Sequence, residues 1–283
     1  MACTFSDASY SAAKYAAFRP KYPSELYEAI MSYHEADNEV ALDLGCGTGV
    51  ISDELVQKKL FERVIGIDPS KGMLEYARKT IPQAVFMDGR AESIPSIENE
   101  SVDLIMVGTA AHWFEPSWWQ EAERVLKPRG TVAVFIYGGL WPEPSHPCAE
   151  ELRATMFSFA DELGFSNKGN LICHEMYDQL QLPDERLVEL GDYKRIDWNR
   201  YGLGDKLVMS EKMNLKTYRE RIHTYGPMHR WRIANPSKLG KKDEDPAEKT
   251  LEKLKKILGT QDEDTEIDCG HSLSLILFRR KSL

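Results

Sequence analysis

Three glycines and two carboxylates have the types and spacing of a nucleoside-binding site. They are Gly45, Gly47 and Gly49, with Asp43 before them and Asp68 after them. The glycines follow the apolar segment Val40–Leu44, and a backbone without Cβ atoms can turn tightly and approach a ligand closely. A second apolar segment, Val64–Ile67, leads into Asp68, whose carboxylate could accept hydrogen bonds from ribose hydroxyls. This arrangement predicts a bound nucleoside cofactor.

The glycine spacing discriminates between nucleoside cofactors. Gly-x-Gly-x-Gly differs from the Gly-x-Gly-x-x-Gly of dinucleotide sites, which brings a helix N-terminus against a pyrophosphate. A carboxylate at Asp43 favours a ligand with an ammonium group, bound directly or through water. S-adenosylmethionine (SAM) has an ammonium group and no phosphate, so it is the predicted cofactor. A nicotinamide-dependent oxidoreductase and a purely structural turn are the alternatives.

The residues that begin at Asp68 have a functional and a structural interpretation. Asp68 could clamp the ribose, or it could cap a helix that starts near Ser70, because carboxylates favour that position. Met73 could lie against an adenine or belong to the core. Similarly, the backbone at Arg90 and Ala91 could pair with the adenine edge, because it follows a strand at the ligand-binding edge of the sheet.

Arg90 also has a simpler interpretation as an exposed salt-bridge partner of Glu92. A further candidate lies in Val107–Phe114, where small residues at the end of a strand leave room for a methyl donor. His112 and Trp113 would then face the reacting centre. A histidine beside aromatic residues can be structural, or it can be a general base.

Alternating sequence patterns predict the elements that position these residues. The predicted strands are Val40–Leu44, Val64–Ile67, Ala84–Met87, Leu104–Val107 and Thr131–Tyr137. The predicted helices between them include Gly49–Lys58, Ser70–Thr80 and Ser117–Leu126. Strands that alternate with helices indicate a parallel sheet covered on both faces.

The pattern changes after Tyr137. Gly138, Gly139 and three prolines predict a loop, followed by a helix over about 148–163 and a strand over 187–198. The last predicted strand is 272–280. Mainly helical patterns lie between these two strands, and an insertion of this length is typical of a lid or a substrate wall.

The predicted fold is therefore a doubly wound, mostly parallel sheet of seven strands with a helical insertion before the last strand. We expect an N-terminal helical cap over 1–38, an α/β core that binds the cofactor over 39–198, a helical lid over 199–266, and the last core strand within 267–283.

Composition limits the partners. The chain of 283 residues has a formal net charge of −9, which argues against nucleic acid. The lysines of 238–256 alternate with acidic residues, as on a solvated helix face. Five scattered cysteines without a C-x-x-C pair predict neither a metal site nor a disulfide framework. No membrane-spanning or signal pattern occurs, so we expect a cytoplasmic monomer or homodimer without membrane partners.

Five motifs, in this order, resemble those of class I SAM-dependent methyltransferases. They are Asp-Leu-Gly-Cys-Gly-Thr-Gly, Gly-Ile-Asp-Pro-Ser, Ala-Glu-Ser-Ile-Pro, Ala-His-Trp-Phe and Arg-Val-Leu-Lys-Pro-x-Gly. The chain is most similar to fungal trans-aconitate methyltransferase-like enzymes, which also have an early Arg-Pro-x-Tyr-Pro, here Arg19–Pro23. They share a later aromatic segment resembling Tyr225–Trp231. The resemblance covers residues 10–137 well and 215–232 loosely.

This resemblance implies roles for particular residues. The glycines would contact the methionine moiety, Gly108 would lie beneath the sulfonium, and Tyr15, Arg19 and Tyr22 would cover the cofactor. Arg90 departs from the acidic or small residue that is usual before Ala91. The predicted cofactor-binding residues are Tyr15, Arg19, Asp43, Gly45, Cys46, Gly47, Thr48, Gly49, Asp68, Pro69, Met73, Arg90, Ala91, Glu92 and Gly108.

Methyl transfer from a sulfonium is an in-line displacement, and positioning can lower such a barrier by about 7–11 kcal/mol. A carboxylate acceptor is ionised at pH 7 and needs a clamp, whereas a phenol or enol would need a base, for which His112 is the candidate. The predicted acceptor-binding residues are Trp113, Tyr225, His229, Arg230 and Trp231, and Arg19 is a further clamp candidate.

We therefore expect an O-methyltransferase for a small organic acid or secondary metabolite. The alternative is a SAM-binding protein of the same fold with a non-methylating or structural role.

Overall fold

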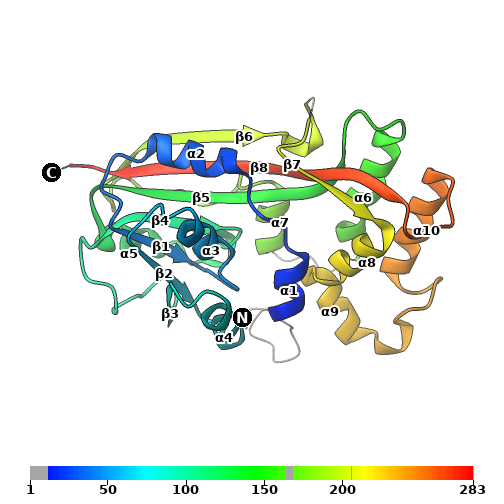
Figure 1. Cartoon of the computed structure of the whole chain (residues 1–283), viewed down its shortest axis with the longest axis horizontal. Helices are drawn as coiled ribbons and strands as arrows, with labels where there is room; N and C mark the ends of the chain where they lie inside the picture. The colour runs from blue at the N-terminus through cyan, green and yellow to red at the C-terminus, as the bar shows by residue number, and fades with distance from the viewer. Residues whose placement is uncertain (1–11, 164–167, 205, 283) are drawn as a thin grey trace.

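One twisted sheet with helices on both faces forms the centre of the protein (Figure 1). The computed structural model describes residues 12–163, 168–204 and 206–282. The first part of the predicted N-terminal cap, residues 1–11, lies outside these ranges. The rest of the cap contains two helices, α1 (Ala12–Phe18) and α2 (Ser24–Tyr33).

Strands and helices alternate through the first half of the chain and become irregular after it. The strands are β1 Val40–Leu44, β2 Arg63–Asp68, β3 Val85–Asp88, β4 Val102–Gly108, β5 Leu126–Pro142, β6 Leu190–Trp198, β7 Met209–Asn214 and β8 Glu266–Arg280. The further α-helices are α3 Val50–Gln57, α4 Lys71–Thr80, α5 Trp118–Val125, α6 Ala149–Glu162, α7 Lys168–His174, α8 Leu215–His223, α9 Gly226–Ala234 and α10 Pro246–Leu258. Short 3₁₀ helices include η2 Ala111–Trp113.

The strand order is β3-β2-β1-β4-β5-β8-β6, and β7 pairs with β8 off this path. The first five strands of this order are mutually parallel, while β8 is antiparallel to β5, β6 and β7. The predicted mostly parallel α/β sheet is therefore confirmed. Among the described residues the sheet has eight strands, so the predicted number of seven is wrong.

The residues of the central strands pack alternately on the two faces. Leu104 and Met106 of β4 share a core with α2 and α3, whereas Ile105 and Val107 share one with α5. Successive strand residues point to opposite faces, so a continuous apolar run is what a strand buried on both sides requires. The helices cover the sheet on both faces as expected (Figure 1).

Two strands, β5 and β8, extend beyond their predicted bounds of 131–137 and 272–280. In β5 the chain continues through Gly138 and Gly139 to Pro142, with an irregularity between Tyr137 and Leu140, so the predicted loop at these glycines is wrong. Its far end pairs with Cys269–His271 of β8, and the long partner strand satisfies backbone groups that a loop would have left to water.

The strand that the sequence analysis did not predict is β7, which lies near the start of the predicted helical lid over 199–266. Met209–Asn214 pairs with Glu266–His271 of β8, next to β6 on the same side of that strand. Its polar, lysine-containing sequence carries little strand signal, and the edge position accounts for this. The remainder of segment 199–266 is mainly helical: α8, α9 and α10 share a separate apolar core with α6, which lies earlier in the chain (Figure 1).

No helix in the described part of the chain combines the length and apolar character of a membrane span.

Candidate functional site

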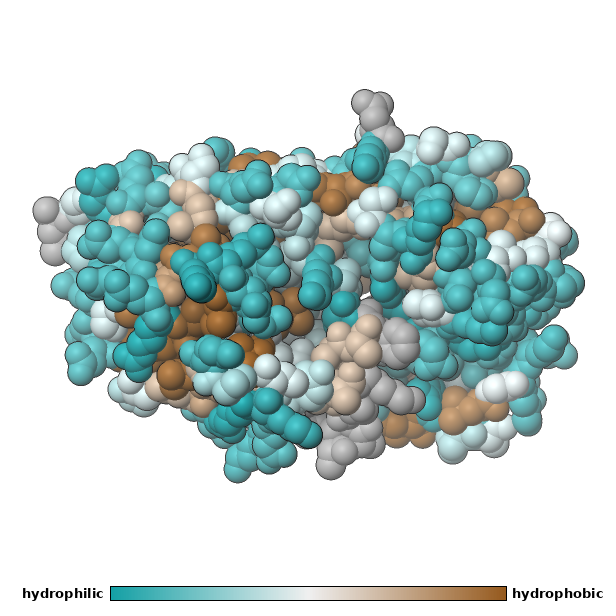
Figure 2. Space-filling model, viewed as in Figure 1, coloured by the Kyte–Doolittle hydropathy of each residue, from teal (hydrophilic) through white to brown (hydrophobic). Residues whose placement is uncertain are grey.

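A cavity of about 1020 Å³ lies between the α/β part and the helical lid. Its lining comes from the ends of β1, β2 and β4, from the N-terminal segment, and from α7 and α9. Figure 2 shows the surface hollowed between these two parts of the molecule. Ligand pockets measure about 300–1,000 Å³, so this cavity has room for a cofactor and a second small molecule.

The glycine loop forms one wall of the cavity. Gly45 has a φ of +76°, and a Cβ there would lie 2.6 Å from the Cβ of Ala110, so both conformation and space require glycine. Gly47 has a φ of +53°, but a Cβ there would meet nothing within 4 Å. Its bare backbone therefore faces open space, where a ligand can approach.

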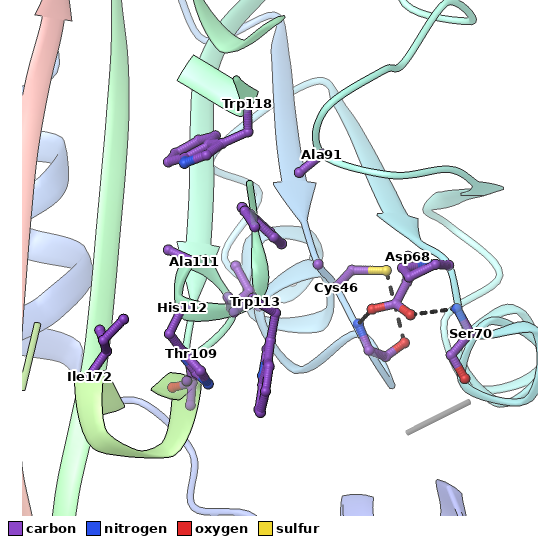
Figure 3. Close-up of a pocket in the computed structure, with 18 of the residues that line it drawn as sticks. Cys46, Asp68, Ser70, Ala91, Thr109, Ala111, His112, Trp113, Trp118 and Ile172 are labelled. Carbon is purple, nitrogen blue, oxygen red and sulfur yellow. Dashed lines mark hydrogen bonds between the residues drawn. The ribbon is translucent and has the colours of Figure 1, made fainter. Parts of the chain in front are cut away.

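Asp68 lies at the end of β2 and holds the glycine loop against the start of α4 (Figure 3). Its carboxylate accepts hydrogen bonds from the backbone N–H of Gly47, at 2.9 Å, and from that of Ser70, at 2.8 Å. Burial raises the pKa of this carboxyl above its usual value. Asp68 thus holds Ser70, the residue that precedes α4, and also lines the cavity, and the carboxylate oxygens keep lone pairs for a ligand.

Asp43 is placed behind the loop and is absent from the cavity lining. Its side chain is fully buried and accepts hydrogen bonds from the backbone N–H and the hydroxyl of Ser52, which anchors α3. One carboxylate oxygen has no hydrogen-bond partner among the described residues, and burial raises the pKa of Asp43 to about 7. Any effect on a ligand's ammonium would therefore act through intervening groups.

The loop after β3 forms the next part of the wall. Ala91, Met73 and Glu92 line the cavity. Only 3% of the surface of Met73 is exposed. The Arg90 guanidinium lies 3.3 Å from the Glu92 carboxylate, so the salt-bridge alternative is the contact observed. The backbone of this loop remains at the cavity edge.

The end of β4 and the short helix η2 form another part of the cavity wall, which we call the floor (Figure 3). A Cβ on Gly108 would lie 2.5 Å from Ile51 and 2.9 Å from the Tyr22 hydroxyl, so this position is closely packed. The Tyr22 hydroxyl also lies 2.9 Å from Thr109 Oγ1. This contact connects the N-terminal segment to the floor.

His112 and Trp113 extend from η2 toward the cavity (Figure 3). Burial, reinforced by the nearby Arg19 guanidinium, lowers the pKa of His112 to about 3. Its Nδ1 lies 3.0 Å from the hydroxyl of Tyr177. His112 is therefore neutral over the physiological pH range.

Three of the lining cations, Arg19, Lys168 and Arg230, come from the N-terminal segment, α7 and α9, and we call this part of the lining the basic end. Arg19 lies over the ring of Tyr15 and donates a hydrogen bond to the Tyr137 hydroxyl. Arg230 donates a hydrogen bond of 2.7 Å to Asn170 of α7.

The part of the lining with the glycine loop, Asp68 and the loop at Ala91 we call the glycine end. The carboxylates among the described lining residues, Asp68, Glu92 and Glu115, belong to it, because Glu115 N–H donates to Glu92.

Several predicted site residues lie elsewhere. A Cβ at Gly49 would lie 2.6 Å from Ile81, so this glycine faces the core. Tyr225 and Trp231 pack in the lid core, and neither they nor His229 appear in the cavity lining. Of the predicted acceptor residues, the structure brings Trp113 and Arg230 to the cavity.

The structure also adds residues that the sequence analysis did not select. Tyr137 ends the predicted strand 131–137 at the ligand-binding edge of the sheet, and this position was a usable signal. Lys168 and Ile172 lie on α7, which has no local motif. Gly169 permits this approach, because a Cβ there would lie 2.8 Å from the Trp113 ring.

The strand order, the glycine loop after β1 and the carboxylate after β2 together define a Rossmann-like fold of the class I methyltransferase type. The match to a particular family agrees with this class. The family model described as "Methyltransferase domain" matches residues 42–134, the part of the chain that contains the glycine end.

Curated relatives cover the same part. The chain is 39% identical over 125 residues to a "Putative methyltransferase" of Dictyostelium discoideum, which is 44% of this chain and 46% of that protein. It is 34% identical over 136 residues to a "Probable S-adenosylmethionine-dependent methyltransferase" of Saccharomyces cerevisiae, again 46% of each. The matched part thus spans about half the length of these relatives.

A solved structure extends the fold comparison to almost the whole chain. It is named as a "Putative Type II Methyltransferase" from Anaeromyxobacter dehalogenans and covers 94% of this chain and 100% of its own, with a TM-score of 0.70 and 21% identity. At this identity the likeness concerns the fold. Residues 42–134 are thus similar to a methyltransferase domain, and the cofactor that this similarity supports is S-adenosylmethionine.

The residues at the glycine end fit this cofactor. Gly47 leaves its Cβ position open, and the buried hydroxyl of Thr48 has no hydrogen-bond partner among the described residues. A polar ligand would occupy this space and satisfy the hydroxyl. In residues 12–163, 168–204 and 206–282, no cluster of side chains could hold a metal ion.

Proposed function

We propose that the whole chain is a SAM-dependent methyltransferase that methylates a carboxylate oxygen of a small organic acid. The observation that carries this proposal is the charge of the cavity. Arg19, Lys168 and Arg230 line the basic end, while the described lining carboxylates lie at the glycine end. A cationic cleft in a chain of net charge −9 favours an anionic ligand.

The two ends have separate tasks in this proposal. We infer that Gly45, Gly47 and Thr48 hold the methionine moiety, that Asp68 binds the ribose, and that the backbone at Ala91 faces the adenine. When bound, SAM supplies an electrophilic methyl group on a sulfonium. Gly108 lines the cavity together with His112 and Trp113, and we infer that the methyl group lies beside them.

The basic end positions the methyl acceptor. Arginine side chains at 19 and 230 suit a carboxylate, because a guanidinium presents paired N–H donors in the matching geometry. One carboxylate oxygen forms the new C–O bond while the C–S bond breaks and its electron pair stays on sulfur. The acceptor is already ionised at pH 7, so no proton has to be removed.

The resemblance to trans-aconitate methyltransferase-like enzymes supports the same class of acceptor. A SAM-binding protein that does not transfer methyl groups is the alternative. The cavity volume of about 1020 Å³ favours the enzyme, because a cofactor with a purely structural role needs no further space for an acceptor.

The proposal can be tested with isotope-labelled SAM and a matched panel of compounds. Each small organic acid is offered beside its amide, which lacks an ionised oxygen. We expect label in a methyl ester that releases methanol on alkaline hydrolysis, and no transfer to the amides. Label found only in amines, protein or nucleic acid would contradict the proposal, and cofactor binding without turnover across the panel would favour the non-methylating alternative.

A further inference from the structure

Tyr177 is a buried residue beneath the floor of the cavity that the methyl-transfer proposal does not use. Only 1% of its surface is exposed, and it does not line the cavity. The chain places it there through two successive left-handed residues, Met176 with a φ of 50° and Tyr177 with a φ of 68°. Such conformations are unfavourable for residues other than glycine, so the surrounding packing must maintain them.

The surroundings of the Tyr177 hydroxyl determine where its proton lies. Burial raises the pKa of the phenol well above its usual value, so the oxygen carries its proton. A buried O–H group needs an acceptor. In the described part of the chain, the hydrogen-bond partner of this hydroxyl is His112 Nδ1, 3.0 Å away. The phenol O–H therefore donates to Nδ1.

This bond determines the tautomer of His112. A neutral imidazole carries one proton, and a nitrogen that accepts a hydrogen bond cannot carry it. The proton is thus on Nε2. Among the described residues Nε2 has no hydrogen-bond partner, and it is accessible from the cavity that His112 lines (Figure 3).

The charged group that acts on His112 is Arg19 of the N-terminal segment, and Tyr177 is its hydrogen-bond partner. Lys168, Arg230, Glu92 and Glu115 line the same cavity. Burial and the Arg19 guanidinium both disfavour a positive imidazolium, so the neutral ring is retained.

We propose that Tyr177 is a positioning residue that fixes His112 as the neutral Nε2–H tautomer, so that His112 donates a hydrogen bond to the carboxylate of the methyl acceptor. His112 then aligns the acceptor together with the cations and removes no proton. The destination of this hydrogen bond rests on the proposed function, whereas the tautomer does not.

The tautomer can be read directly by long-range ¹H–¹⁵N NMR of the histidine rings in the full chain, saturated with S-adenosylhomocysteine. His112→Gln identifies the signals of His112. We expect a protonated Nε2, an unprotonated Nδ1 and no titration between pH 5.5 and 8. In Tyr177→Phe we expect a mixture of tautomers or a titration within that range. A protonated Nδ1 in the unaltered protein would overturn the proposal, as would an unchanged His112 pattern in Tyr177→Phe.

Kinetics test the role in acceptor binding. Tyr177→Phe should lower kcat/KM for the acceptor about tenfold, as for a lost hydrogen bond, and leave cofactor affinity unchanged. Tyr218→Phe is the matched control, because Tyr218 is buried in the lid core outside the cavity.

His112→Gln keeps an N–H donor and should retain clearly more activity than His112→Ala. Equal loss in both variants, with a rate in the unaltered protein that falls as pH decreases through 6.5, would assign a general base and reject the donor role. If no acid is methylated by the unaltered protein, the proposed function fails while the NMR result still decides the tautomer.

Discussion

The two ends of the cavity are built in different ways. At the glycine end, the cavity lining comes from backbone and short side chains on two neighbouring strand ends, with Asp68 bonded to the N–H of Gly47 and of Ser70. At the basic end, long cationic side chains converge from segments far apart in the chain, such as Arg19 and Arg230. The glycine end is built from residues close together in the sequence, whereas the basic end depends on how α7, α9 and the N-terminal segment pack against the sheet.

This difference separates two binding tasks. A backbone loop anchored on strands reproduces one fixed shape, which suits a cofactor that does not vary. Cationic side chains on α7, α9 and the N-terminal segment can change without disturbing the sheet, and this suits an acceptor that differs between proteins. Substitutions at one end should therefore leave ligand affinity at the other end intact.

The largest expected effect is that of a methyl group at the glycine end. Gly45→Ala forces a left-handed conformation and a contact of 2.6 Å with Ala110, and we expect a loss of about 2–5 kcal/mol in the free energy of unfolding, with loss of cofactor binding. Denaturant unfolding and calorimetry measure both. Gly72→Ala is the control, because its Cβ meets nothing within 4 Å. An equal effect of Gly72→Ala would contradict a specific requirement for glycine at position 45.

Asp68→Ala should have the next largest effect. It leaves the N–H groups of Gly47 and Ser70 and the proposed ribose hydroxyls without their acceptor, so cofactor affinity should fall by about 1–3 kcal/mol. Calorimetry with S-adenosylhomocysteine checks this. Asp88→Ala, at the exposed end of the adjacent strand β3, should bind normally. Unchanged affinity in Asp68→Ala would mean that the ribose contact is misassigned.

Arg230→Gln probes the basic end. We expect KM for the acid to rise about five- to tenfold, because one charge-assisted hydrogen bond to a partly exposed group is lost. Cofactor affinity should not change. Arg232→Gln, an exposed position on the same helix, makes the same change of charge outside the cavity. A parallel loss of cofactor affinity in Arg230→Gln would show that the two ends are not separate.

The smallest expected difference between the two ends is in how ligand binding depends on pH. The pKa of Asp43 is raised to about 7, so this carboxyl is mainly ionised at pH 8 and mainly neutral at pH 6. A cationic cofactor favours the ionised form, and its affinity should fall severalfold as pH decreases across this interval. On the floor beside the proposed acceptor, the pKa of His112 is about 3, so acceptor KM should stay constant. Asp43→Asn should flatten the cofactor curve; a curve unchanged by that variant would assign the titration elsewhere.

The sequence patterns predicted the regular elements best where the local signal and the tertiary environment agree. Val40–Leu44 is the strand predicted, and α4, Lys71–Thr80, differs by one residue from the helix predicted over Ser70–Thr80. The patterns failed where pairing overrides propensity. Gly138 and Gly139 are typical of a loop, but β8 supplies a long partner that keeps them in β5. Similarly, Met209–Asn214 becomes a strand because the far half of β8 offers an open edge.

The sequence by itself determined the glycine end, because Gly45, Gly47 and Asp68 act through backbone geometry at the ends of adjacent strands, and that geometry follows from residue type and order. Only the tertiary structure decided the rest. It placed Asp43 behind the loop, brought Arg19 and Arg230 to one cavity, and set Tyr177 against His112. Contacts between segments so far apart depend on packing of the lid against the sheet, for which no local pattern exists.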